Sequence, residues 1–193
     1  MSWNQDQEWE KNWHNNCVNS YWEETKQQVY AKKMGLLAQS INGKFPVFNL
    51  KDISVADIGG GPYSLLLKCI NVNGTVVDPC NYPKWTRDRY KEVKIKLIQQ
   101  PAEERLDKKF DEIWIYNCLQ HTQNPEKIIK NSRQCSRLIR LFEWIDEPIS
   151  IGHPQVLTEE RLNSTLGGEG KVEELSESGC FGKAYYGIFR GDL

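Results

Sequence analysis

Residues 53–67 constrain the fold of this chain more than any other stretch. The β-branched residues Ile53, Val55 and Ile58 are typical of a buried strand. The glycines at 59–61 then give the backbone a conformational freedom that residues with a Cβ lack. Pro62 suits the first position of a helix, which we expect to continue to Lys68. This order exposes helix N–H groups beside bare backbone, which suits a nucleotide-like ligand, whereas the alternative is a tight strand–helix junction without a ligand.

Predicted strands and helices alternate along the rest of the chain. We expect strands at 53–58, 74–78, 94–98, 110–116, 137–144, 171–175 and 184–189. We expect helices at about 9–17, 23–40, 82–92, 124–136 and 158–167. Strands that alternate with helices predict a parallel sheet. The last two strands are joined by a glycine-rich turn, which predicts a final antiparallel pair.

Asp78 ends the second predicted strand, seventeen residues after Gly61. A carboxylate at such a strand end can accept hydrogen bonds from both hydroxyls of a ribose, and about twenty residues is the usual separation in dinucleotide folds. The alternative is an acid that caps the turn before Pro79. Ser64 weakens an NAD interpretation of the glycine turn, because the dinucleotide fingerprint has its third glycine there.

Composition excludes several classes of protein. The chain has 193 residues, 39% of them apolar, and a net charge of −1, which fits one globular domain over 1–193 without a preference for nucleic acid. Its apolar runs are too short for a membrane span or a signal peptide, so we expect a cytoplasmic protein. The six cysteines include no C-x-x-C pair, which favours reduced thiols. The three histidines are far apart in the sequence, so we expect no metal centre.

Asp57, followed by Gly59 and Gly61, resembles the first motif of the class I S-adenosylmethionine-dependent methyltransferases. Tyr63 departs from that motif, because many members have a third glycine at this position. The resemblance covers about residues 50–190. It implies an α/β fold of the Rossmann-like three-layer type, with a seven-stranded, mostly parallel sheet and an antiparallel last strand.

The resemblance also implies a set of cofactor contacts. Ala102 and Glu103 resemble the segment that frames adenine in this family, although Pro101 replaces the usual acid before the alanine. Asn117 and Cys118 follow the fourth strand and would lie beside the methionyl part of the cofactor. The residues expected to bind S-adenosylmethionine, and its product S-adenosylhomocysteine, are Asp57, Gly59, Gly60, Gly61, Asp78, Ala102, Glu103, Asn117 and Cys118.

Residues 1–45 precede the Rossmann-like core at 50–193 and are rich in tryptophan. Trp9 and Trp13 recur at helical spacing and would lie on one face of a helix. The family resemblance suggests that helices here form a lid over the ligand cleft, with Trp13 and Tyr21 as candidate substrate contacts. The alternative is that the tryptophans are core residues that anchor a helix to the sheet.

The function implied is transfer of a methyl group to an oxygen or nitrogen atom of a small-molecule acceptor by in-line displacement. Alignment is worth up to about 7–11 kcal/mol of the barrier, against ~3–5 kcal/mol from a general base. His153 and His121 are candidate bases for a hydroxyl acceptor, or each orders its own loop. Glu143 and Asp146 could orient an amine acceptor.

Two other functions remain open from the sequence. One is a catalytically inactive S-adenosylmethionine-binding partner subunit or sensor, since no residue is an unambiguous catalyst. The other is an NAD(P)-dependent enzyme, against which Ser64 and the terminal strand pair both count.

Overall fold

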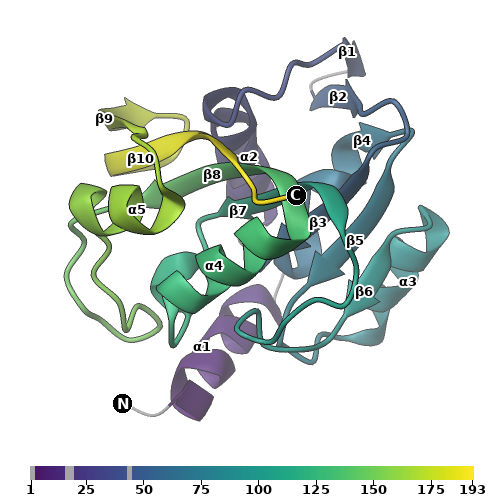
Figure 1. Ribbon diagram of the computed structural model, residues 1–193. Coiled ribbons are helices and arrows are strands. Elements are labelled where there is room, and N and C mark those ends of the chain that lie inside the picture. Colours follow the sequence, from purple (N-terminus) through teal and green to yellow (C-terminus); the bar gives the residue numbers. More distant parts are fainter. Residues whose placement is uncertain (1–2, 16–19, 43–44) are drawn as a thin grey trace.

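The computed structural model describes residues 3–15, 20–42 and 45–193. Its main sheet has seven strands in the order β6-β5-β3-β7-β8-β10-β9 (Figure 1). These strands are β3 (Ser54–Ile58), β5 (Asn73–Val77), β6 (Lys96–Ile98), β7 (Phe110–Tyr116), β8 (Ser136–Trp144), β9 (Lys171–Glu177) and β10 (Cys180–Arg190). Neighbouring strands from β6 to β8 are parallel, and β10 is antiparallel to both β8 and β9. The predicted seven-stranded sheet with an antiparallel last strand is confirmed.

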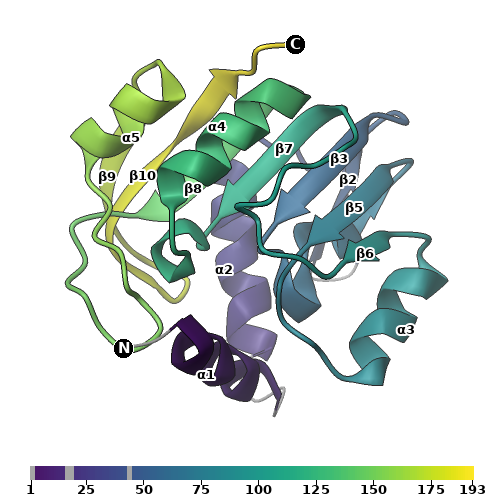
Figure 2. The same ribbon diagram turned by 60° about the horizontal axis from the view of Figure 1, so that its bottom comes forward.

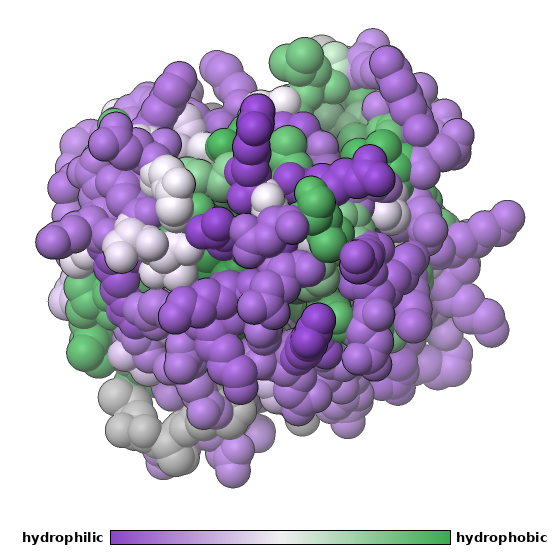
Figure 3. All heavy atoms as spheres, in the orientation of Figure 1, coloured by the Kyte–Doolittle hydropathy of each residue, from purple (hydrophilic) through white to green (hydrophobic). Residues whose placement is uncertain are grey.

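Helices cover both faces of this sheet and complete the three layers. They are α2 (Ser20–Lys33), α3 (Lys84–Glu92), α4 (Pro125–Cys135) and α5 (Glu159–Leu166). Helices α4 and α5 lie together on one face, and α2 lies on the other (Figure 1, Figure 2). The face shown in Figure 3 is mostly hydrophilic, with apolar side chains in scattered patches.

The protein has two buried hydrophobic clusters, one on each face of the main sheet, and the side chains of the central strand β7 alternate between them. Ile113 and Ile115 pack in one buried cluster with side chains of α4 and α5. Trp114 and Tyr116 point to the opposite face and pack in a second cluster with side chains of α2. Successive residues of a strand face opposite sides, so the apolar run at 113–116 requires a covering layer on each face.

Local sequence signals place the ends of two helices. Asn124 accepts a hydrogen bond from Lys127 N–H, and Pro125 occupies the first turn of α4. Thr158 accepts from Arg161 N–H at the start of α5, and Gly167 ends this helix with a φ of 70°. Both helix starts are confirmed as predicted.

Two local predictions are wrong. After the glycine turn the chain forms two short 3₁₀ turns, η1 (Gly61–Tyr63) and η2 (Leu65–Lys68), in place of an α-helix. Ser64 causes this break, because its backbone is extended (φ −50°, ψ 142°) and its hydroxyl accepts from Leu66 N–H. The helix predicted at 23–40 ends earlier, and the following residues form a small second sheet.

That second sheet consists of β1 (Ser40–Asn42), β2 (Phe45–Asn49) and β4 (Cys69–Ile70). Helix α1 (Trp3–Asn15) crosses the molecule below the main sheet in Figure 2, close to the carboxyl ends of its parallel strands. None of the helices in the described ranges combines the length and the apolar character that crossing a bilayer requires.

Candidate functional site

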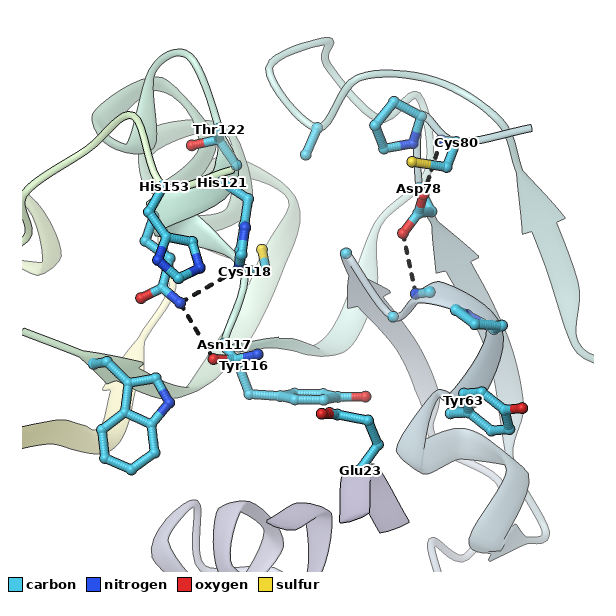
Figure 4. Close-up of a pocket in the computed structure, with 18 of the residues that line it drawn as sticks. Glu23, Tyr63, Asp78, Cys80, Tyr116, Asn117, Cys118, His121, Thr122 and His153 are labelled. Carbon is cyan, nitrogen blue, oxygen red and sulfur yellow. Dashed lines mark hydrogen bonds between the residues drawn. The ribbon is translucent and has the colours of Figure 1, made fainter. Parts of the chain in front are cut away.

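A cavity of about 390 Å³ opens at the carboxyl ends of β3, β5, β7 and β8. Parallel α/β sheets bind ligands at this edge, and the volume is within the usual range for small-molecule sites. In Figure 4, Asp78 and Cys80 lie on one side of the hollow, and His121, His153 and Thr122 lie on the other. Tyr116 and Glu23 lie at its lower edge in this view.

The glycine turn after β3 forms one wall of the cavity. Gly59 has a φ of 69°, and a Cβ there would lie 2.7 Å from the Cβ of Cys118. Gly61 has a φ of 56°, and a Cβ there would have only the hydroxyl of Tyr82 within 4 Å, at 3.6 Å. The absence of a side chain at Gly59 therefore allows the loop that contains Cys118 to pack against the turn. At Gly61 the same absence leaves bare backbone facing the cavity.

Asp57 lies beneath this turn and does not line the cavity. Its side chain has no exposed surface, and Oδ2 accepts hydrogen bonds from Ser64 Oγ at 2.5 Å and Tyr116 Oη at 2.6 Å. Burial raises the pKa of Asp57 to about 7, against the lowering effect of these two hydroxyls. Asp57 is therefore not placed to contact a cofactor directly, contrary to our prediction. We infer that it acts indirectly, by holding the shape of the glycine turn.

Asp78 links the glycine turn to the end of β5. Its Oδ2 accepts from Gly61 N–H at 3.0 Å, and its Oδ1 accepts from Cys80 N–H at 2.9 Å. The carboxylate lines the cavity although the residue is only 5% exposed. Each carboxylate oxygen can accept a further hydrogen bond, so Asp78 can still receive hydroxyl donors from a ligand.

The loop after β7 is held by a carboxylate that lies behind it. Glu143 Oε1 accepts from the N–H groups of Cys118 and Leu119, both at 3.1 Å. Glu143 has no exposed surface and does not line the cavity, and burial raises its pKa to about 7. The prediction of Glu143 as a substrate contact is therefore corrected: the side chain orders the loop, and the loop lines the cavity.

Asn117 and Cys118 both line the cavity, as do Ala102 and Glu103. Asn117 has a φ of 48°, a left-handed conformation that turns the chain sharply away from the sheet. Burial raises the pKa of the Cys118 thiol well above its usual value, so this side chain forms a neutral wall. Glu103 directs its carboxylate to the N–H of Gln123 at 2.9 Å, which leaves backbone to face a ligand.

His121 and His153 lie together at the opposite end of the cavity, although the sequence separates them by more than thirty residues. Their ring centroids are 4.5 Å apart in an edge-to-face arrangement. His121 Nδ1 donates to Gly152 O at 2.7 Å, and Nε2 lies 3.3 Å from Gln120 Nε2. A carbonyl can only accept, so Nδ1 carries the proton and Nε2 accepts from the Gln120 amide.

Helix α1 contacts both sides of the cavity. On the histidine side, Gly152 N–H donates to Asp6 Oδ1 at 3.1 Å, and a Cβ on Gly152 would lie 2.7 Å from the Trp9 ring. On the opposite side, Cys80 Sγ lies 3.2 Å from Gln7 Oε1. The helix thus spans the opening.

Helix α2 contributes Glu23, Lys26, Gln27 and Tyr30 to the cavity wall. Gln27 Nε2 donates to Tyr63 O, and Gln27 Oε1 accepts from Lys68 Nζ at 2.6 Å, so α2 is attached directly to the residues after the glycine turn. The side chains of Trp13 and Tyr21, which we predict as substrate contacts, lie outside the described part of the structure.

Several cavity residues escape the sequence analysis, and Asp146 is not one of the lining residues. Asp146 instead pairs with Lys183 Nζ at 2.7 Å, whereas its neighbour Glu147 lines the cavity. The lining residues that the sequence analysis misses include Trp9, Tyr30, Tyr82, Gln120, Trp144, Glu147 and Phe181. They are separated along the chain and share no motif, so only their exceptional aromatic content could have drawn attention to them.

The described part of the chain contains no group of side chains that could form a metal site. Among the described residues, no three His, Cys, Asp or Glu side chains gather in a way that could hold a metal ion. The five described cysteines, at 69, 80, 118, 135 and 180, carry free thiols.

Comparison with known proteins identifies a methyltransferase domain over residues 56–138. This segment contains the glycine turn, Asp78 and the loop after β7. No curated protein matches the chain by sequence. Structural similarity is extensive, with sequence identities low enough that it establishes the fold alone.

The DhpI structure in complex with S-adenosylhomocysteine is 11% identical, with a TM-score of 0.63 and coverage of 99% of this chain and 98% of that one. Magnesium protoporphyrin IX methyltransferase from Synechocystis with bound S-adenosylhomocysteine is 14% identical, with a TM-score of 0.60 and coverages of 89% and 84%. The complex of the Haloferax volcanii Trm112 methyltransferase activator with a methyltransferase is 11% identical, with a TM-score of 0.62 and coverage of 97% of this chain and 97% of that one. Some other solved chains are covered over only 49% to 65% of their length.

Proposed function

The chain belongs to the class I S-adenosylmethionine-dependent methyltransferases, and from this premise we propose that it methylates an oxygen or nitrogen atom of a small-molecule acceptor. The observation that carries the proposal is the single cavity in which the glycine turn and Asp78 lie opposite two histidines and several aromatic rings. A cavity of about 390 Å³ beneath two helices suits a small acceptor.

The described residues fit the cofactor. Gly61 offers bare backbone toward the cavity, where a side chain would project into the space. Asp78 has capacity to accept ribose hydroxyls, and the backbone at Ala102 and Glu103, which line the same cavity, would frame an adenine edge. Asn117 lies farther along the wall, where the methionyl part would bind.

S-adenosylmethionine supplies a methyl group on a sulfonium centre, which is already a good leaving group. The protein therefore has two principal tasks, alignment of the acceptor and exclusion of water. Alignment at about 3–3.5 Å is worth up to about 7–11 kcal/mol of the barrier. Helices α1 and α2 serve both tasks as the lid of the cleft, since α1 contacts both of its sides and α2 is attached to Tyr63.

For a hydroxyl acceptor, His153 and His121 are the candidates for the general base. Both ring nitrogens of His121 are engaged, with Gly152 O and with the Gln120 amide, which suits a positioning role. The His121 ring packs edge-to-face against His153 and orients it at the cavity wall. A base contributes about 10²–10⁴-fold in rate, less than alignment.

Reduced thiols support a cytoplasmic location. Disulfides are typical of oxidising compartments, and the cysteines at 69, 118, 135 and 180 carry free thiols.

Isothermal titration with S-adenosylmethionine, and separately with NAD, tests the cofactor assignment. We expect S-adenosylmethionine to bind and NAD not to bind. Asp78→Ala should weaken S-adenosylmethionine about 10–100-fold, because two charge-assisted hydrogen bonds are lost. Asp88→Ala, a matched change on the exposed side of α3, should leave the affinity within about twofold.

Radiolabelled methyl transfer to panels of small hydroxyl and amine compounds tests the acceptor assignment. Transfer to a protein or nucleic-acid panel alone would contradict the small-molecule proposal. Cofactor binding without transfer to any panel would instead support a catalytically inactive binding partner or sensor.

A further inference from the structure

One part of the cavity wall, away from Asp78, is formed by Trp144, Glu147 and Phe181. Asp78 follows β5, whereas Trp144 ends β8, and three strand spacings separate these strands in the sheet. At about 4.8 Å per spacing, the two ends lie about 14 Å apart across the sheet edge. This wall therefore belongs to the part of the cavity available to the acceptor.

Trp144 and Glu147 both approach Gly182 of β10. A Cβ on Gly182 would lie 3.1 Å from Glu147 Oε1 and 3.6 Å from Cε3 of Trp144. The φ of 128° at Gly182 is a conformation that side-chain-bearing residues rarely adopt. The preceding residue, Phe181, keeps 70% of its surface exposed and lines the cavity from the β9–β10 hairpin.

Charge distinguishes Glu147 from the acids around it. Asp146 pairs with Lys183 at 2.7 Å, and Glu23 pairs with Lys26 at 3.0 Å. Within the described ranges, Glu147 has no ion-pair or hydrogen-bond partner. The acceptor end of the cavity thus carries one negative charge that the surrounding side chains leave uncompensated.

An uncompensated carboxylate that lines the same cavity as two aromatic side chains is a chemical match for an organic cation. Tryptophan and phenylalanine faces attract cations, and the attraction strengthens where water is partly excluded. A carboxylate in the same place adds charge-assisted hydrogen bonds to an ammonium group. An anionic acceptor would meet repulsion at this wall, and a neutral one would leave Glu147 without a partner.

We propose that the methyl acceptor carries an ammonium group that binds Glu147 between Trp144 and Phe181. The inference rests on the proposed function and names the substrate class of the same site. A protonated amine has no lone pair, so the ammonium anchors the acceptor and a second oxygen or nitrogen atom is methylated. At that atom a bond to the methyl carbon forms as the carbon–sulfur bond breaks, and the proton passes to His153 or to water.

Binding of two small phenols to protein saturated with S-adenosylhomocysteine tests this proposal. Tyramine carries an ammonium group, and 4-ethylphenol has the same ring and hydroxyl without it. We expect tyramine to bind at least about fivefold more tightly than 4-ethylphenol in isothermal titration. Glu147→Gln should reduce this preference to less than about twofold and leave 4-ethylphenol binding unchanged.

Glu174→Gln is the matched control, because it removes the same charge from an exposed residue of β9 outside the cavity. It should retain the preference for tyramine. Equal affinities for the two phenols in the native protein, or a preference that survives Glu147→Gln, would overturn the ammonium site while S-adenosylhomocysteine still binds. Loss of S-adenosylhomocysteine binding itself would overturn the proposed function.

Discussion

The two ends of the cavity are built in different ways. At the end where we propose that the cofactor binds, the cofactor end, Gly59, Gly61, Asp78 and Cys118 each lie within a few residues of a parallel strand end. At the end that we propose for the acceptor, the acceptor end, the wall comes from α1, α2, the residues after β8 and the β9–β10 hairpin, which are distant in the sequence. A strand end is positioned by the sheet itself, whereas the acceptor wall depends on how separate elements pack.

The two ends also differ in how they are held together. Buried carboxyls support the cofactor end, where Asp57, Asp78 and Glu143 accept hydrogen bonds from backbone N–H or hydroxyl groups around the turn and the β7 loop. Helix α1, which we propose as part of a lid, is attached near the cavity by Asp6, Trp9 and Gln7. Elements with few buried attachments open most readily, so we expect the cofactor end to be rigid and the lid to open for exchange of ligands.

The largest effect is expected where the glycine turn touches the β7 loop. Gly59→Ala would force a residue with a Cβ into φ 69°, with that Cβ 2.7 Å from Cys118. Backbone strain and overpacking together cost about 3–4 kcal/mol, which corresponds to at least about a 100-fold loss of S-adenosylmethionine affinity. Calorimetry should show this loss, while Gly168→Ala, where the nearest atom to a Cβ would be at 3.6 Å, should be nearly neutral.

Because Glu143 is buried, we expect the stability of the protein to depend on pH. Its pKa is raised from 4.5 to about 7 by burial, so between these values the folded state binds more protons than the unfolded state. The free energy of unfolding should therefore fall as the pH rises through this window, by about 3 kcal/mol from this group. Urea titrations of Glu143→Gln should show a flatter pH profile than the native protein.

Asp57 contributes a slope of the same sign, since its pKa is raised from 3.8 to about 7. The control Glu174→Gln changes an exposed residue and leaves both buried carboxyls in place. Its free energy of unfolding should therefore depend on pH as that of the native protein does. A Glu143→Gln profile as steep as theirs would show that Glu143 is ionised in the folded protein across this window.

An intermediate effect is expected at the lid. Trp9→Ala removes the ring that packs on Gly152, and partial loss of such burial is worth about 1–1.5 kcal/mol. Hydrogen exchange of α1 amides should become about tenfold faster, while β3 amides stay unchanged. Glu8→Ala, at an exposed position of the same helix, should change neither. Equal acceleration in α1 and β3 would mean that the lid and the cofactor end open together.

The smallest effect is expected beside the acceptor wall. Asp146→Asn breaks an ion pair with Lys183 whose two side chains are 46% and 39% exposed, and such pairs contribute at most about 1 kcal/mol. Because Asp146 does not line the cavity, binding of tyramine should change less than about twofold in titration. A larger loss would restore Asp146 as an acceptor contact and weaken the assignment of this role to Glu147.

The sequence by itself determined the sheet, its order of alternating elements and the position of the glycine turn, because these follow from short-range periodicity and from residues with special backbone preferences. The seven strands and the starts of α4 and α5 could all be predicted from such signals. The 3₁₀ turns after Gly61 could not, because they depend on a hydroxyl cap by Ser64. Nor could the small sheet β1-β2-β4, because its pairing joins segments with no local signature.

Only the tertiary structure decided which side chains face the ligand. Glu143 and Glu147 are four residues apart and chemically identical, yet one is buried behind the β7 loop and the other lines the cavity. His121 and His153 meet only because the loop at 150–153 folds back onto the end of β7. Orientation of this kind arises from packing between elements, which local sequence patterns do not encode.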